Sequence, residues 1–225
     1  MKAAPIGLLG GTFNPVHFGH LRSALELREQ LGLGQVRLIP AAVPPHRELP
    51  SCGAELRAEM VELAVASEPG LACDRRELGR EGPSYTVDTL LELREELGPE
   101  QSLCLIVGTD AIIAIDSWHR WRELIELAHI VVVARPGWAL PDAGEVANWL
   151  ARHLTEDPSS LQHSPSGKLV LQQLRQLPIS ATEIRQLIAD GRSPRYLIPD
   201  AVWERICTTG AYGALPKQQE QHGIG

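Results

Sequence analysis

Short apolar runs alternate with amphipathic stretches along most of this chain of 225 residues. Four of the apolar runs have the length of buried strands: residues 3–9, 36–39, 103–107 and 129–134. Three amphipathic stretches have helical spacing: residues 18–31, 54–66 and 85–97. Strands that alternate with helices need crossover connections, which favour parallel strands with helices on both faces. The sequence therefore predicts an α/β fold with a Rossmann-like, doubly wound and mostly parallel sheet.

The same pattern predicts one domain over residues 1–213, with a small helical part at its C-terminal end. Residues 153–167 are rich in Pro and Ser and indicate a surface loop. Residues 214–225 are largely polar and predict a flexible tail. Neither segment has the length of a linker between independent domains.

Charge and cysteine content argue against several classes of protein. With 28 acidic and 21 basic residues the formal net charge is −7, which disfavours unspecific binding to nucleic acid. The four cysteines form no CxxC pair, so neither a zinc site nor a disulfide framework is indicated. No export signal is seen, and no apolar run approaches the roughly 20 residues of a membrane span. We expect a cytoplasmic protein with reduced thiols, no nucleic acid partner and no membrane contact, and the sequence leaves a homo-oligomer open.

The loop after the first predicted strand carries the strongest functional signal, and it reads GGTFNPVHFGH over residues 10–20. Ligands collect at the carboxyl ends of strands in open α/β sheets. Paired glycines let a phosphate approach the backbone, and the helix start offers free N–H groups. His17 and His20 share one face of this helix, and Gly19 indicates that some group packs against it. We therefore predict a phosphate site here.

Two other interpretations of this loop carry less weight. A glycine turn followed by two surface histidines has the same pattern. A zinc site is less favoured still, because HxGH lacks both the glutamate and the one-turn histidine spacing of HExxH. We predict no metal ligands in the protein.

A second phosphate site is predicted near the C-terminal end. Ser180 and Glu183 form a capping-box pattern, with Gly191 as a plausible helix stop. Arg185 then lies near the positive end of the helix dipole, where a cation is disfavoured unless an anion also binds. A surface arginine with its stem on neighbouring residues is the alternative.

Further candidates lie along the middle of the chain. Ser84 is a plausible N-cap, so the amides of Tyr85 and Thr86 form a candidate anion site. Trp118 follows the loop after the third predicted strand and offers a flat face to an aromatic ring. A capped helix and a half-buried tryptophan explain the same residues without a ligand.

Two more loops at strand ends carry polar side chains. His46 and Arg47 follow the stiff segment Pro44-Pro45, which fixes their direction. Asp110 follows the third predicted strand, where it is a candidate cap of the next helix.

At this point the chain resembles a known family. G-G-T-F-x-P-x-H-x-G-H is similar to the signature of the HxGH nucleotidyltransferase superfamily, whose members transfer nucleotidyl groups from ATP or CTP. More specifically, the chain resembles bacterial nicotinate-nucleotide adenylyltransferases, enzymes of NAD biosynthesis. The matching segments are VPPHR at 43–47, PSYT at 83–86, IVGTD at 106–110, Trp118, ARPG at 134–137 and ISATEIR at 179–185. Asn14 stands where many members have Asp, and superfamily members use either residue.

The resemblance implies transfer of AMP from ATP to nicotinate mononucleotide, with Mg²⁺ bound through the ATP phosphates. Catalysis is assigned to His17, His20 and Arg185. ATP binding is assigned to Gly10, Gly11, Thr12, Phe13, Gly108, Asp110, Ile179 and Ser180. Binding of the acceptor is assigned to His46, Arg47, Tyr85, Thr86, Trp118 and His119. The tryptophan stacks on the pyridine ring, and the amides of Thr86 and His119 bind its carboxylate.

The implied reaction agrees with the residue types present. A phosphate monoester is largely dianionic near neutral pH, so the acceptor needs no general base and no protein nucleophile. Two alternatives stay open: another HxGH enzyme with a different phosphate acceptor, and a catalytically silent nucleotide sensor. Pyrophosphate release separates the sensor from the enzymes.

Overall fold

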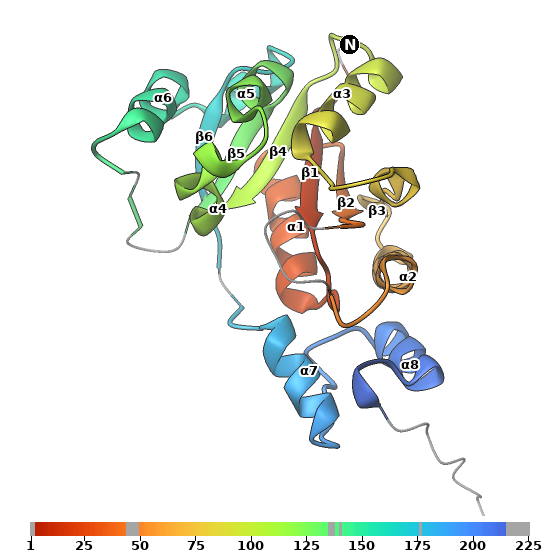
Figure 1. The fold of residues 1–225 in the computed structure, drawn as a ribbon. Helices are drawn as coiled ribbons and strands as arrows, with labels where there is room; N and C mark the ends of the chain where they lie inside the picture. Colours follow the sequence, from red (N-terminus) through yellow and green to blue (C-terminus); the bar gives the residue numbers. More distant parts are fainter. Residues whose placement is uncertain (1–2, 44–49, 135–137, 140, 176, 215–225) are drawn as a thin grey trace, which may run out of the picture.

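The computed structural model describes residues 3–43, 50–134, 138–139, 141–175 and 177–214, and within them six strands form one sheet (Figure 1). The strands are β1 (Ile6–Gly11), β2 (Gln35–Pro40), β3 (Leu71–Cys73), β4 (Leu103–Gly108), β5 (His129–Ala134) and β6 (Leu169–Gln173). Their order is β3-β2-β1-β4-β5-β6, and every neighbouring pair is parallel. The predicted doubly wound sheet is confirmed. Because the order reverses between β1 and β4, a crevice is expected at the carboxyl ends of these two strands.

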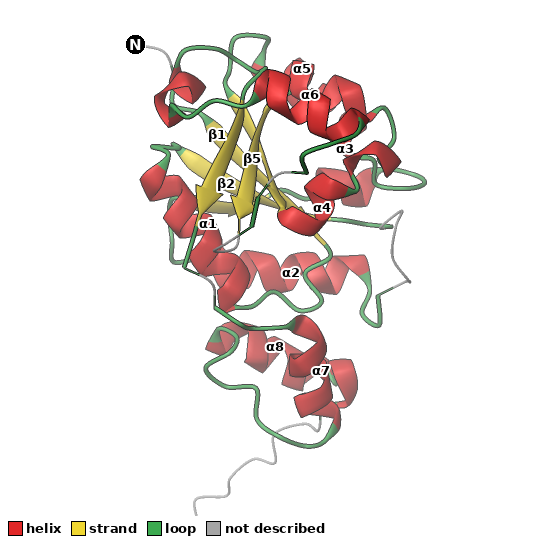
Figure 2. Cartoon of the chain, turned by 90° about the vertical axis from the view of Figure 1, so that its left-hand side faces the viewer, coloured by secondary structure: helices red, strands yellow, loops and turns green. Residues whose placement is uncertain are grey.

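Helices cover both faces of the sheet (Figure 2). They are α1 (Phe18–Gln30), α2 (Ala54–Val65), α3 (Thr86–Leu97), α4 (Thr109–Ile113), α5 (Leu124–Leu127), α6 (Glu145–His153), α7 (Ala181–Ala189) and α8 (Asp200–Thr209). Side chains alternate along a strand, so Cys104 and Ile106 of β4 enter the core shared with α1 and α2. Leu105 and Val107 enter the second core, shared with α3 to α6. Burial on both faces explains why these strands read as continuous apolar runs.

The C-terminal helices α7 and α8 lie beyond the carboxyl ends of the strands in both views (Figures 1 and 2). They join the core of α1 and α2 through Ile184, Ile188, Val202 and Ile206, all of them buried. The predicted helical C-terminal part therefore lies over the edge of the sheet where the crevice is expected. Of the predicted tail the structure describes only Ala214, which is buried.

The predicted surface loop over residues 153–167 is wrong in part. A 3-10 turn, Pro158–Gln162, lies within it, and its Leu161 is fully buried in the core. The Leu161 carbonyl accepts a hydrogen bond from the buried Ser102 hydroxyl at 2.7 Å. Composition indicated a loop because a single buried apolar side chain within a polar segment leaves no periodic pattern. Among the described residues, no helix is both long and apolar enough to cross a bilayer.

Candidate active site

The loop after β1 lies at the carboxyl end of the strand, as predicted, and the strand order places it at the switch point of the sheet. Gly10 and Gly11 end the strand, and a Cβ atom added to Gly10 would meet no other atom within 4 Å. Phe13 has φ of +46° and is buried, with its ring 3.0 Å from the position of a Gly11 Cβ. The two glycines are thus explained differently. Gly11 makes room for Phe13, whereas Gly10 leaves open space toward the cavity.

His17 and His20 face one another at the start of α1, which confirms that they share a face. Their rings stack with centroids 3.7 Å apart, and the edge of Phe13 packs 5.1 Å from His20. The His17 amide donates to Nδ1 of His20 at 3.3 Å. His17 is only 6% exposed, and this burial lowers its pKa to about 4. At neutral pH His17 is therefore an uncharged hydrogen-bonding group.

Gly19 leaves space for the ring of His17. A Cβ atom at position 19 would lie 3.0 Å from Cε1 and from Nδ1 of that ring, closer than side chains normally pack. The sequence predicted that some group packs against Gly19, and the structure identifies the group. The glycine keeps His17 in place beside His20.

The C-terminal segment supplies the opposite wall. Ser180 is the N-cap of α7, as predicted, but its side chain makes no capping hydrogen bond, so the capping box is not formed. Gly191 has φ of +70° just after the helix, where the sequence placed its end. Ser180 lines the cavity, whereas Ile179 packs beside Gly19 in the core and is not a lining residue.

Arg185 of α7 reaches back to the first loop. Its guanidinium donates to the Asn14 carbonyl at 2.8 Å and to the Thr182 hydroxyl at 3.2 Å. Arg185 lines the same cavity as His17 and His20. Two donors hold the side chain, and further N–H groups of the planar guanidinium are left for an anion.

The acceptor side differs from the prediction at Ser84. Tyr85, not Ser84, is the N-cap of α3, and the Ser84 hydroxyl instead accepts a hydrogen bond from the Ala42 amide at 3.1 Å. The Tyr85 amide donates to the Pro83 carbonyl at 3.1 Å, so it does not point freely outward. The Thr86 amide is first in the helix and has no intrahelical acceptor. The candidate anion site at this helix start therefore rests on Thr86.

Trp118 and His119 lie across from this helix start. The His119 ring packs on the Tyr85 ring with centroids 4.5 Å apart. Neither the His119 amide nor the Thr86 amide donates to a described residue. Asp110 does not cap the helix after β4: Gly108 is the N-cap of α4, and Asp110 lies in its first turn. Both residues line a cavity together with Trp118. His46 and Arg47 lie outside the described residues.

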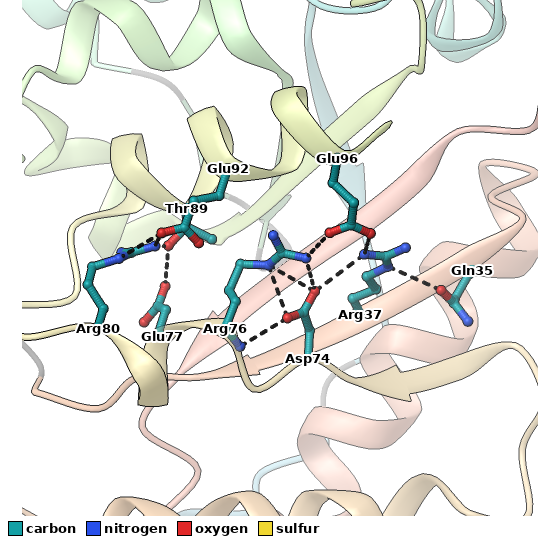
Figure 3. Close-up of polar contacts among 9 residues, drawn as sticks. All are labelled: Gln35, Arg37, Asp74, Arg76, Glu77, Arg80, Thr89, Glu92 and Glu96. Atoms are coloured by element: carbon teal, nitrogen blue, oxygen red, sulfur yellow. Dashed lines mark hydrogen bonds and ion pairs between the residues drawn. The ribbon is translucent and has the colours of Figure 1, made fainter. Parts of the chain in front are cut away.

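The start of α3, Trp118 and His119 together form what is here named the acceptor wall. The buried carboxyl group of Glu77 supports the α3 part of this wall (Figure 3). Glu77 is 7% exposed and accepts a hydrogen bond from the Thr89 hydroxyl at 2.7 Å. Burial raises its pKa, against the opposing hydrogen bonds from Thr89 and Ser84. Arg80 donates to the same Thr89 hydroxyl at 3.2 Å and pairs with Glu92. This network holds Ser84, and with it the start of α3, against the end of β2.

One cavity of about 1060 Å³ brings the predicted groups together. Its lining includes Gly10, Gly11, Thr12, Phe13, His17, His20, Tyr85, Thr86, Asp110, Trp118, His119, Ser180 and Arg185. A smaller cavity of about 440 Å³ reaches toward Glu77 and Gly108 and shares Gly10, Thr86 and Trp118 with the larger one. Within the described residues, no group of three or more His, Cys, Asp or Glu side chains could hold a metal ion. The arrangement suits two anionic ligands that meet beside the histidines.

Sequence reasoning missed the residues that hold the first loop in place. The Tyr212 hydroxyl donates to Oδ1 of Asn14 at 2.7 Å, from 198 positions away in the chain. The Asn14 amide group is also 3.4 Å from the Ser51 hydroxyl. No local pattern marks Tyr212, because such a contact forms only after the C-terminal segment packs over the sheet.

Comparisons with known proteins agree with this geometry. Residues 8–187 match the family described as Cytidylyltransferase-like. A protein of Halorhodospira halophila named probable nicotinate-nucleotide adenylyltransferase is 53% identical over 210 residues, which are 92% of this chain and 95% of the relative. A protein of Aeromonas salmonicida with the same name is 49% identical over 214 residues, 95% of this chain and all (100%) of the relative.

A solved structure shows the same fold. The Plasmodium falciparum nicotinic acid mononucleotide adenylyltransferase, complexed with NaAD, has a TM-score of 0.68 at 15% sequence identity. The match covers 94% of this chain and 98% of that chain. At this identity the likeness concerns the fold alone, whereas the close sequence relatives establish descent. This chain belongs to the nicotinate-nucleotide adenylyltransferase family, within the cytidylyltransferase-like proteins.

Proposed function

We propose that this protein transfers AMP from ATP to nicotinate mononucleotide, giving nicotinate adenine dinucleotide and pyrophosphate. The observation that carries the proposal is the single cavity, about 1060 Å³ in volume, that joins His17, His20 and Arg185 to Thr86 and Trp118. One end of it suits the phosphates of ATP, and the other suits a planar, negatively charged ring. The names of the close relatives support the same pair of substrates.

In the proposed mechanism the acceptor phosphate is itself the nucleophile. One of its oxygens forms a bond to the α-phosphorus of ATP, while the bond from that phosphorus to the bridging oxygen breaks and pyrophosphate leaves. Because the phosphate is already ionised, the protein contributes positions and charge stabilisation rather than a base. His17 and His20 contact the α-phosphate, and Arg185 stabilises the negative charge of the departing β- and γ-phosphates.

The remaining assignments concern binding. The backbone of residues 10–13 and the start of α7 at Ser180 bind ATP, and Ile179, which does not line the cavity, packs against the core just before Ser180. Gly108 and Asp110 bind ribose hydroxyl groups. Trp118 stacks on the pyridine ring, beside Tyr85. The amides of Thr86 and His119 bind the ring carboxylate, and His46 and Arg47 contact phosphate. Discrimination between acid and amide follows from the two amide donors, since hydrogen bonds to a charged group contribute about 1.5–3 kcal/mol.

Magnesium, the extent of the catalytic domain and the cellular location complete the proposed function. Magnesium enters with its substrate as MgATP, bound by phosphate oxygens and water rather than by a carboxylate cage. Residues 1–213 form the catalytic domain, and residues 215–225 lie outside the described residues. The enzyme acts in the cytoplasm, where its four cysteines, free in the structure, stay reduced.

Pyrophosphate release from MgATP tests the function. Nicotinate mononucleotide and nicotinamide mononucleotide are compared at equal concentrations, with 4′-phosphopantetheine as a third acceptor. We expect the acid to be preferred over the amide by about tenfold or more in kcat/KM. Equal rates with acid and amide would contradict the role of Thr86 and His119. Release with phosphopantetheine alone would indicate another HxGH enzyme, and no release with any acceptor would indicate a sensor.

A further inference from the structure

Arg57 of α2 is one of the largest fully buried side chains in the described structure, 1% exposed, and none of the described carboxylates pairs with it. A buried charge is costly unless hydrogen bonds compensate it, and here burial lowers the pKa of the guanidinium. Among the described residues, all of its hydrogen-bond partners are backbone carbonyl oxygens. The presence of an arginine at this buried position is best explained by the segments of the chain that these carbonyl groups belong to.

The carbonyls belong to three separate segments around the cavity. One terminal nitrogen donates to Thr12 at 2.6 Å, in the loop after β1. The other donates to Ala41 at 2.7 Å and to Ala42 at 3.2 Å, just after β2. Nε donates to Cys52 at 3.2 Å, before α2. The guanidinium of Arg57 thus joins the loop proposed to bind ATP to the segment just after β2. That segment leads along the chain to His46 and Arg47, which are proposed to contact phosphate.

The segments that Arg57 joins are also tied to the catalytic and acceptor walls. The Ala41 amide donates to the Gly11 carbonyl at 2.9 Å, and the Ala42 amide donates to the Ser84 hydroxyl. A shift of Thr12 would displace the loop that carries His17, and a shift of Ala42 would displace the start of α3. Arg57 thus contacts segments that lead into both proposed substrate subsites.

We propose that Arg57 is a positioning residue that sets the separation between the nucleotide loop and the acceptor wall. The proposal rests on the function proposed above. A lysine in its place keeps the positive charge, but its single ammonium group has no planar fork and cannot hold carbonyls on three segments in the same geometry. Loss of the clamp lowers the reaction rate because reacting groups misplaced by about 1 Å react on the order of 100-fold more slowly.

Arg94 of α3 provides a matched control at the amino-terminal ends of the strands, away from the cavity. It also donates to backbone carbonyls, those of Leu127 at 2.8 Å, Gln101 at 2.6 Å and Pro165 at 2.9 Å. These residues precede β5, β4 and β6, so this arginine holds strand starts and not the cavity. The variant Arg94→Lys removes the same kind of hydrogen bond without touching either substrate wall.

The test compares Arg57→Lys and Arg94→Lys with the unaltered protein by thermal unfolding, by steady-state kinetics well below each Tm, and by hydrogen exchange. We expect both variants to lower the Tm. Only Arg57→Lys is expected to lower kcat/KM, by about 100-fold, and to speed exchange of the Ala41 amide at least about tenfold. If Arg57→Lys does not fold, Arg57→Gln is measured in the same way.

The outcomes separate this proposal from the proposed function. Hydrogen exchange needs no substrate, so faster exchange at Ala41 in Arg57→Lys alone supports the clamp even if the unaltered protein releases no pyrophosphate. Unchanged exchange at Ala41 overturns the proposal, as does a kcat/KM within about threefold of the unaltered enzyme. Equal catalytic losses in the Arg57 and Arg94 variants also overturn it, since they would indicate a general effect of stability.

Discussion

The buried, neutral state of His17 predicts a specific loss of stability in acid. Its pKa is lowered by burial from an ordinary value of 6.5 to about 4, so the unfolded chain binds a proton at this residue before the folded protein does. Above pH 6.5 both states are neutral there and His17 has no effect. As the pH falls from 6.5 toward 4, protonation favours the unfolded chain, and stability decreases.

The size of this loss follows from the two pKa values. At pH 5 the difference in proton binding destabilises the folded protein by about 2 kcal/mol, and below pH 4 by about 3 kcal/mol. The variant His17→Gln removes the titration while keeping a polar side chain. Its free energy of unfolding is therefore expected to fall less between pH 7.5 and pH 5 than that of the unaltered protein, by about 2 kcal/mol.

Urea unfolding at pH 7.5, 6 and 5 measures this difference. Titrating groups that do not contact His17 act equally in both proteins and cancel, including His129, whose pKa is also lowered by burial. Parallel curves of stability against pH would refute the reasoning, since they would mean that His17 does not stay neutral in the folded state. A gap that opens only below pH 6.5 would support it, and with it the assignment of His17 as an uncharged donor to the α-phosphate.

Three further predictions concern catalysis. The variant His20→Ala is expected to lower kcat about 100-fold or more with little loss of ATP affinity measured by calorimetry, and an unchanged kcat would contradict its role. The variant Trp118→Ala is expected to raise the KM of nicotinate mononucleotide about tenfold to 100-fold more than that of ATP, and equal effects on both would exclude stacking. The variant Gly19→Ala is expected to gain up to about 1 kcal/mol in helix propensity yet lose at least about tenfold in kcat, because the new Cβ displaces His17; full activity would show that the ring has room to move.

Local sequence patterns predicted the elements whose burial is visible in their own run of residues. The strand at His129–Ala134 is buried on both sides, so its β-branched run is visible without any knowledge of the rest of the fold. The first loop was predicted for a similar reason, because a strand, two glycines and a helix start imply a position at the edge of the sheet. β3 was missed since it has three residues, fewer than an alternating pattern needs.

The predicted helix caps were wrong where the hydrogen bond of a polar side chain depends on residues far away in the sequence. Ser84 precedes a helix and was predicted to be its cap. Its hydroxyl instead accepts a hydrogen bond from the Ala42 amide, 42 positions earlier. Ser180 is at the N-cap position without making the bond that the pattern implied. Sequence identifies such residues as hydrogen-bonding groups near a helix end, whereas the partner depends on which loop the fold brings alongside.

The same limit applies to the residues that hold the site together. Arg57 shares a face of α2 with the buried Met60 and Val61, and an arginine on an apolar face is a signal of burial, though not of its partners. Tyr212 offers no signal at all, because it follows the last helix in a short turn. Both residues act on the backbone or side chains of the first loop over long sequence separations.

These contacts explain how a loop of small residues can be rigid before any ligand binds. Asn14 is held by Tyr212 through its side chain and by Arg185 through its carbonyl, while Arg57 holds Thr12 two positions earlier. Arg185 is at the same time oriented toward the cavity by the loop that it supports. Because both partners are already in place, binding of the ATP phosphates costs little side-chain entropy and keeps more of its free energy for the transition state. In the proposed mechanism the C-terminal helices thus form the second half of the nucleotide site, and their packing on α1 and α2 is part of the catalytic geometry.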